Sequence, residues 1–241
     1  MSTTSRLLAF VLLACSPAFA ASAPVEITTC GQAIPRGTVG YLTADLDCTG
    51  YDGGPGAVMV SRNATFELRG HRVTGGLLGV VYGELRPDRL GDIRLYMTGK
   101  CRVTGGGGTV SAAEAHGVFA SAPTITDLTI ENVGQQGVYA LKRAWFTNVT
   151  ISGSGTEGAR VDGPVRIEGS TVSGSAESGV IARAVKVWDS SMFGNGTSAA
   201  CTPIRHCVDL FSKLRPKVVN TVCDTSGAPS PTRTWHVCAA D

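Results

Sequence analysis

A glycine returns about every 21 residues in the second half of the chain, and each time it opens the same short pattern. The four copies are Gly117-Val118-Phe119-Ala120, Gly137-Val138-Tyr139-Ala140, Gly158-Ala159-Arg160-Val161 and Gly179-Val180-Ile181-Ala182. A fixed period of this size indicates one structural unit stacked on itself. The repeat therefore favours a solenoid, in which each unit contacts mainly the units before and after it.

Each unit contains a second apolar segment that alternates with period 2, which predicts strands with one buried face. Two registers of this segment are apolar in every unit, and they comprise Ile125, Phe146, Ile167 and Val187, and then Ile130, Ile151, Val172 and Met192. Between these registers, Thr129, Thr150, Thr171 and Ser191 are expected to point outward as a ladder of hydroxyl groups.

Turns rich in small residues follow the second segment of each unit, at 132–134, 152–155, 173–175 and 193–196. Gly and Asn tolerate the positive φ that a sharp corner between strands needs. With 31 Gly in 241 residues and no helical spacing, the chain is expected to be all-β. The prediction is a single-chain parallel β-helix, right-handed by the general rule for parallel crossovers. A β-sandwich is the alternative, but it gives uneven strand spacing.

The amino-terminal half carries a resemblance to a known group. Cys30-Gly31-Gln32, Asp45-Leu46-Asp47-Cys48 and the widened coil 66–76, whose ending recurs at 101–106, resemble the opening of secreted bacterial right-handed parallel β-helix repeat proteins, which have the pectate-lyase-like superfold. The chain departs from that group at Glu67 and Arg69, where Asp and Asn are usual. The resemblance implies the fold, but not an activity, because this superfold supports lyases, hydrolases, epimerases and adhesins.

The first 20 residues predict an export signal. Arg6 precedes an apolar run, and Ala18-Phe19-Ala20 offers small residues at the cleavage spacing. Residues 21–241 would then form one elongated β-helix domain, with regular repeats at about 115–225. An alternative is a lipoprotein box ending at Cys15, which would anchor the protein through a lipid. The apolar run is too short to span a bilayer, and no later segment is long enough.

Seven cysteines remain after removal of the signal, and an exported protein normally pairs them. Proximity in the sequence suggests three pairs, which are Cys30–Cys48, Cys201–Cys207 and Cys223–Cys238, with Cys101 left over. The first and last pairs would close the two ends of the solenoid, where strand edges are open. Six cysteines allow 15 connectivities, so these pairings are hypotheses. A metal site using His71 and Cys101 would have too few ligands.

The outward position of the first repeated strand is held by Phe119, Tyr139, Arg160 and Ile181, and Asp209 is expected to continue the row if the strand resumes at Val208. Exposed aromatic rings beside an arginine suit a polysaccharide, because sugars offer apolar faces and hydroxyl groups. Trp145 and Trp188 lie on the other strand, at positions that do not match. The competing interpretation is that a loop, such as 85–90, covers this row and that its apolar side chains pack beneath it.

A catalytic alternative uses Arg160 and Asp162, which are two apart on one strand and point the same way, with Arg143 or Arg183 in support. A surface ion pair between Arg160 and Asp162 is the plainer interpretation. Other charged residues, including Asp127, Glu168 and Asp189, are spread over neighbouring coils. We expect no cofactor and no metal, and calcium enters only under a lyase activity that gathers carboxylates.

Without the signal, 20 basic residues face 19 acidic ones, a net charge of +1. This nearly neutral net charge does not indicate a protein that binds nucleic acid. The sequence therefore predicts an exported, periplasmic or extracellular, non-catalytic module that binds a polysaccharide or another cell-surface component along a flat face. A polysaccharide lyase and a purely structural stalk are the two alternatives.

Overall fold

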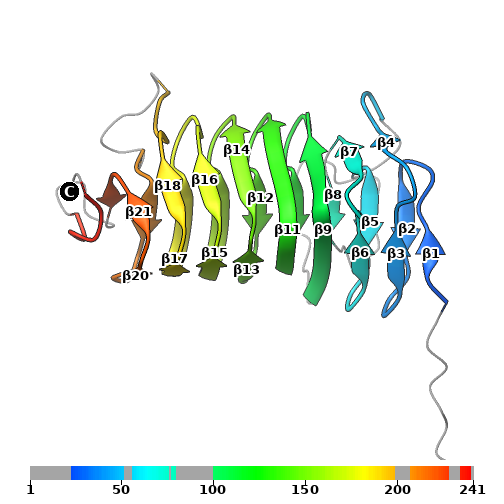
Figure 1. Cartoon of the computed structure of the whole chain (residues 1–241), viewed down its shortest axis with the longest axis horizontal. Coiled ribbons are helices and arrows are strands. Elements are labelled where there is room, and N and C mark those ends of the chain that lie inside the picture. The colour runs from blue at the N-terminus through cyan, green and yellow to red at the C-terminus, as the bar shows by residue number, and fades with distance from the viewer. Residues whose placement is uncertain are drawn as a thin grey trace, which may run out of the picture.

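The computed structural model describes residues 23–51, 56–75, 77–79, 100–198, 207–227 and 234–239. All helices and strands found within these ranges are β-strands, and they pair in parallel to form one continuous stack of coils (Figure 1). The predicted parallel β-helix is confirmed, and its right-handed sense stays a prediction. The signal peptide, Cys15, the 85–90 loop and Cys201 lie outside the described residues.

Three faces, each made of parallel strands from successive coils, run along the molecule. The first face consists of β2 (Gln32–Ile34), β5 (Val58–Val60), β8 (Leu77–Gly79), β10 (Val118–Ala120), β12 (Val138–Ala140), the beginnings of β15 (Ala159–Glu168) and β17 (Val180–Trp188), β19 (Leu210–Ser212) and β22 (Ser226–Gly227).

The second face follows the first within each coil. It consists of β1 (Val25–Glu26), β3 (Val39–Tyr41), β6 (Thr65–Glu67), the beginnings of β9 (Lys100–Ser111) and β11 (Ala122–Val133), β13 (Ala144–Thr147), the ends of β15 and β17, and β20 (Lys217–Val219).

The third face completes the coil. It consists of β4 (Leu46–Asp47), β7 (Arg72–Thr74), the ends of β9 and β11, β14 (Thr150–Ser154), β16 (Thr171–Ser173), β18 (Ser191–Phe193) and β21 (Val222–Cys223).

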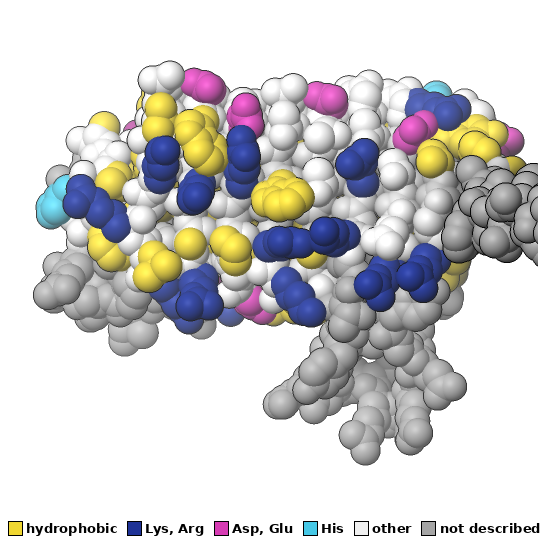
Figure 2. All heavy atoms as spheres, turned by 90° about the horizontal axis from the view of Figure 1, so that it is seen from below, with side chains coloured by type: hydrophobic (Ala, Val, Ile, Leu, Met, Phe, Trp, Pro, Cys, Tyr) yellow, Lys and Arg dark blue, Asp and Glu magenta, His cyan; other side chains and the backbone are white. Residues whose placement is uncertain are grey.

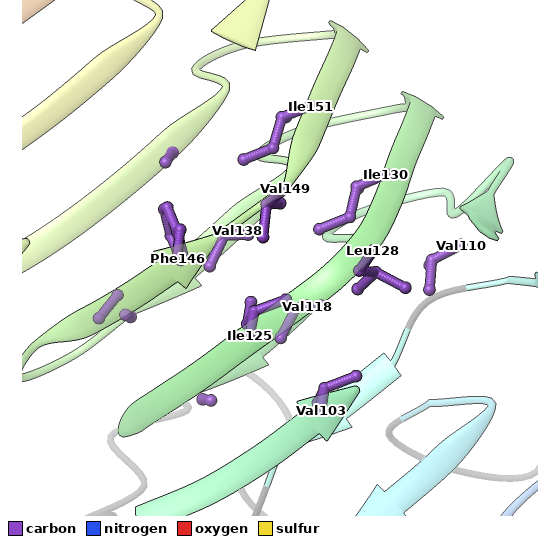
Figure 3. Packing of buried hydrophobic residues seen from close by; sticks show 14 of the residues in the cluster. Val103, Val110, Val118, Ile125, Leu128, Ile130, Val138, Phe146, Val149 and Ile151 are labelled. Carbon is purple, nitrogen blue, oxygen red and sulfur yellow. The ribbon is translucent and has the colours of Figure 1, made fainter. Parts of the chain in front are cut away.

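Apolar side chains from all three faces meet on the axis of the coil (Figure 3). The two predicted registers are confirmed. Ile125, Phe146, Ile167 and Val187 align on the second face and are buried, as are Ile130, Ile151, Val172 and Met192 on the third. Thr129, Thr150, Thr171 and Ser191 form the expected outward ladder. Each large side chain removed from water contributes about 1.5–3 kcal/mol, so the stacked rows provide much of the stability.

The repeated glycine is required by close packing rather than by an unusual backbone conformation. A Cβ atom at Gly137 would lie 2.6 Å from the carbonyl oxygen of Gly158 and would overlap the side chain of Ile151. Gly158 is in the same situation, 2.6 Å from the carbonyl oxygen of Gly179. The repeated glycine therefore marks the position at which the backbone of one coil packs directly against the next coil.

The corner between the second and third faces needs a positive φ in every regular coil. Asp127, Asn148, Gly169, Asp189 and Asn220 occupy it, with φ between 47° and 58°. Asn148 donates to a carboxylate oxygen of Asp127 at 3.0 Å, and Asn220 donates to Asp189 at 3.1 Å. Gly169 therefore fits this ladder, because Asn, Asp and Gly are the residues that tolerate the left-handed region.

Disulfides stand near both ends of the described stack. Cys30 bonds to Cys48, and Cys223 bonds to Cys238, as the spacing predicts. Cys207 is also disulfide-bonded. Such bonds indicate an exported protein in an oxidising compartment. The described segments contain no helix that could cross a membrane.

Cys101 is a buried free cysteine, as expected. It does not align with His71, because it lies at the start of β9 on the second face, whereas His71 directly precedes β7 on the third. His71 instead approaches Asp45 at 3.4 Å. The two side chains are therefore not placed to share a metal ion.

Candidate functional site

The row predicted on the first face exists as a parallel ladder. Phe119 pairs with Tyr139, Tyr139 with Arg160, and Arg160 with Ile181. Strands in a sheet lie about 4.8 Å apart, so the four side chains follow one another along the axis at that interval. Phe119, Tyr139 and Ile181 are half-buried, and Arg160 is exposed. We call these four residues the aromatic row.

Asp209 does not continue the aromatic row, which corrects the prediction. The next residue in register is Phe211, because β19 begins at Leu210 rather than at Val208. Asp209 is buried, and its carboxylate accepts hydrogen bonds from the backbone N–H groups of Asp224 and Thr225 at 2.9 and 3.1 Å. Its role is to satisfy backbone donors near the last coil, where ladder partners run out.

His116 joins the aromatic row at its amino-terminal end. The ring centroids of Phe119 and Tyr139 are 5.3 Å apart, and the imidazole of His116 lies 5.5 Å from each. On the other side, the guanidinium of Arg160 lies 5.9 Å from the centroid of the Tyr139 ring. Three rings and a cation thus form one continuous strip over three coils.

A polar row runs alongside the rings and holds Arg160 in place. The Glu157 carboxylate is 4% exposed, and it accepts hydrogen bonds from the Arg160 guanidinium at 3.2 Å and from the Gln136 amide at 2.7 Å. A buried carboxylate is tolerated only with such partners. In place of the expected surface pair with Asp162, the exposed Arg160 guanidinium pairs with the buried carboxylate of Glu157.

Ionisation of the site follows from burial. Burial lowers the pKa of the His116 imidazole, while the side chain of Gln136 and the charge of Glu157 oppose that change. Burial also raises the pKa of the Tyr139 phenol, the charge of Asp162 raises it further, and Arg160 opposes it. At neutral pH the imidazole is therefore uncharged and the phenol keeps its proton, so both present hydrogen-bonding groups without a net charge.

Two polar atoms of the site lack a partner within the described part of the chain. They are Nδ1 of His116 and Oε1 of Gln136, both of which are buried. Neither atom is accessible from the surface, so both belong to the polar row beneath the rings, where the Gln136 side chain acts on the His116 imidazole.

Sequence reasoning missed His116, Gln136 and Glu157 as a set. The signal was present, because all three residues directly precede a repeat glycine and so share one register. The other candidates from the sequence are not brought to this site. Asp127 and Asp189 serve the corner between the second and third faces, and Glu168 pairs with Arg166 at 3.3 Å on the second face.

For calcium, the described ranges contain no group of three or more His, Cys, Asp or Glu side chains placed to hold a metal ion. Arg160 and Asp162 do lie on one strand, β15, as predicted. The structure engages Arg160 with Glu157 and brings Asp162 to the phenol of Tyr139 instead. The two residues of the catalytic alternative therefore belong to the same site but act on different neighbours.

Comparison with known proteins adds no family to this description. No protein-family model, no curated protein and no solved structure significantly matches the chain.

Proposed function

We propose that this protein is an exported binding module that holds a glycan along the aromatic row of its first face. The observation that carries the proposal is the continuous strip formed by His116, Phe119, Tyr139 and Arg160. Sugar rings stack their apolar C–H faces on aromatic side chains, and their hydroxyl groups bind polar neighbours. A rigid stack of coils presents such a strip without reorganisation on binding, which lowers the entropic cost.

The electrostatics of the strip favour uncharged sugars. Arg160 is already neutralised by Glu157, and His116 is kept uncharged by burial. Asp162 is exposed and provides an acceptor for hydroxyl groups beside Tyr139. An acidic sugar would gain little from the paired arginine and would be repelled by Asp162.

The proposal includes the finer assignments that the resemblance implies. The protein would be a secreted bacterial right-handed β-helix repeat protein, periplasmic or extracellular, after removal of residues 1–20. A lipid on Cys15 would tether the same module to a membrane. The disulfides near both ends of the stack are in keeping with each of these locations.

A polysaccharide lyase is the second candidate, supported by the meeting of an uncharged imidazole, a phenol, an arginine and a carboxylate in one place. An uncharged His116 can accept a proton, as a general base must. This activity predicts shortened polymer with new unsaturated ends, lost in Asp162→Asn and in His116→Gln. A structural stalk is the third candidate and predicts that no polysaccharide binds or is cut.

The test is size-exclusion chromatography of neutral polysaccharides, such as dextran, galactomannan and a β-1,3-glucan, after incubation with the mature protein. Binding predicts intact polymer that carries the protein with it. A lyase needs a uronate polymer, because elimination removes the proton beside the sugar carboxylate, so polygalacturonate is added to the panel, and its shortening with new unsaturated ends would support the lyase instead. The paired substitution Tyr139→Ala and Arg160→Ala is expected to abolish co-elution. Lys186→Gln with Lys217→Gln, on the second face, is the control and should leave it unchanged. Co-elution that survives the first pair would refute the site.

A further inference from the structure

The second face carries a row of cations, whereas no such row lies on the part of the first face that the structure describes. Trp145 pairs in register with Arg166, Arg166 with Lys186, and Lys186 with Lys217, so four adjacent coils place these side chains in one outward line. Arg166, Lys186 and Lys217 are exposed. At about 4.8 Å per coil, three successive positive charges follow one another along the axis.

Two tryptophans lie between these cations and stack with them. The guanidinium of Arg143 lies 5.1 Å from the ring centroid of Trp145, and that of Arg166 lies 4.9 Å from Trp188. The ammonium of Lys217 lies 5.9 Å from Trp188 on its other side. Such stacking holds a flexible cation in a fixed place while leaving its charge accessible. We call Arg143, Trp145, Arg166, Lys186, Trp188 and Lys217 the basic face.

A shallow hollow of about 380 Å³ lies within the basic face. It is lined by the two indoles, by Arg166 and Lys186, and by the smaller side chains of Pro164, Val165 and Ala184. Trp145 is 44% exposed, an unusual fraction for an indole, so part of its ring is available to a ligand.

The charge of the basic face is not balanced locally. Among the residues that the structure describes, Glu168 forms an ion pair with Arg166 at 3.3 Å, and no carboxylate does so with Arg143, Lys186 or Lys217. Figure 2 views the side of the molecule where β13, β15, β17 and β20 lie in Figure 1. Lys and Arg side chains lie there around hydrophobic ones, whereas acidic side chains are fewer. Positive side chains therefore gather on this face, although the whole chain carries a formal net charge of only +2.

We propose that the basic face is a second binding site, for an acidic polysaccharide whose carboxylate or sulfate groups contact Arg166, Lys186 and Lys217 while its sugar rings stack on Trp145 and Trp188. Alternating cations and aromatic rings match a polymer that alternates charge and apolar ring faces. A single-stranded nucleic acid has related chemistry, but the disulfides indicate export from the reducing cytoplasm and so favour a glycan as the ligand. The site is separate in face and in ligand charge from the aromatic row.

The test compares carboxymethyl-dextran with unmodified dextran, because the two polymers share a backbone and differ in charge. It uses the disulfide-intact mature protein carrying Tyr139→Ala and Arg160→Ala, so that the aromatic row does not contribute. Binding to carboxymethyl-dextran is expected, weakening steeply as salt is raised from 50 to 300 mM, and unmodified dextran is expected not to bind. No binding of carboxymethyl-dextran at low salt, or equal binding of both polymers, would overturn the proposal.

Matched variants locate the site. Lys186→Gln with Lys217→Gln is expected to weaken carboxymethyl-dextran binding roughly tenfold and to flatten its salt dependence. Arg36→Gln with Arg62→Gln removes two exposed charges in the amino-terminal coils and should change affinity less than about twofold. Trp145→Ala is expected to weaken binding with the salt dependence unchanged. The assignment would be refuted if the Lys186/Lys217 variant and the Arg36/Arg62 variant lost equal affinity for carboxymethyl-dextran. Tighter binding of a single-stranded oligonucleotide than of carboxymethyl-dextran would also refute it.

Discussion

The Arg160 guanidinium lies 3.2 Å from the buried carboxylate of Glu157, three residues earlier in the chain and on the same coil. This contact holds the Arg160 side chain beside the Tyr139 ring and neutralises its charge. It also explains why a charged residue can continue a row of half-buried rings, because the exposed Arg160 guanidinium is paired with a buried carboxylate. The properties of the candidate site follow from that pairing.

Removal of the Glu157 carboxylate should destabilise the protein. Glu157→Ala leaves the Arg160 guanidinium and the Gln136 amide without their acceptor, which is expected to lower the free energy of unfolding by about 1–3 kcal/mol. Urea denaturation measures the change. Asp162→Ala removes an exposed carboxylate from the same strand and should cost less than about 0.5 kcal/mol. Equal stability of Glu157→Ala and the wild type would show that the buried pair is unimportant.

Stability should fall in mild acid because of His116. Burial lowers the pKa of this imidazole in the folded state, so the unfolded chain binds a proton first as the pH falls. The free energy of unfolding is then expected to decrease from about pH 7 downward through the unfolded pKa of about 6.5. Denaturation at pH 7.5 and pH 5.5 tests this. His116→Gln should reduce the difference between the two pH values, and an unchanged difference would exclude His116 as its source.

The thiol of Cys101 should be inert while the protein is folded. Burial raises its pKa to about 12, so almost no thiolate forms at neutral pH. We expect no labelling by iodoacetamide of the native mature protein at pH 8, and one labelled residue, Cys101, after unfolding without reductant. Mass spectrometry of the peptides identifies the site. Rapid labelling of Cys101 in the native state would contradict its burial.

The corner ladder predicts how two substitutions of Gly169 rank in stability. Gly169 has φ of 58° between the positions of Asn148 and Asp189, and Asn adopts this conformation more readily than other non-glycine residues. Gly169→Asn is expected to lower the free energy of unfolding by no more than about 1 kcal/mol, because Asn tolerates a positive φ but its Cβ would lie 2.6 Å from the side-chain oxygen of Asn148. Gly169→Val, which is β-branched and more strained at positive φ, should lower it further. Thermal unfolding measures the stability of both variants. A lower melting temperature for Gly169→Asn than for Gly169→Val would show that the positive φ does not limit which residues this corner accepts.

The fold could be predicted from the sequence because the repeat and the burial pattern report the same structure. Ile125 and Phe146 share a register in the sequence and in space, since the coils have nearly equal lengths there. The row from Phe119 to Ile181 was predictable for the same reason. The prediction for Asp209 was wrong because the chain before β19 is longer than in the regular repeats, so the fixed spacing no longer gives the register. Asp209 instead accepts hydrogen bonds from the backbone of a later segment.

The basic face was harder to predict than the aromatic row. Trp145 and Trp188 occupy different registers, and Trp188 contacts Arg166 and Lys217 from coils on either side. The pairing of β15 with β17 also shifts between Val161 and Pro164. Trp145, Arg166 and Lys186 directly precede the predicted register of Phe146, Ile167 and Val187, so this part of the row could be read from the sequence. Lys217 could not, because a longer coil separates it from Lys186.

The central claim is that a glycan lies along the aromatic row, and hydrogen–deuterium exchange tests it most directly. Exchange should be measured on the mature protein with and without the neutral polysaccharide that co-elutes with it. We expect slower exchange in peptides that contain β10, β12 and the beginning of β15, and no change in peptides confined to β14, β16 and β18 on the third face. Protection confined to the third face, or none at saturating polymer, would contradict the account.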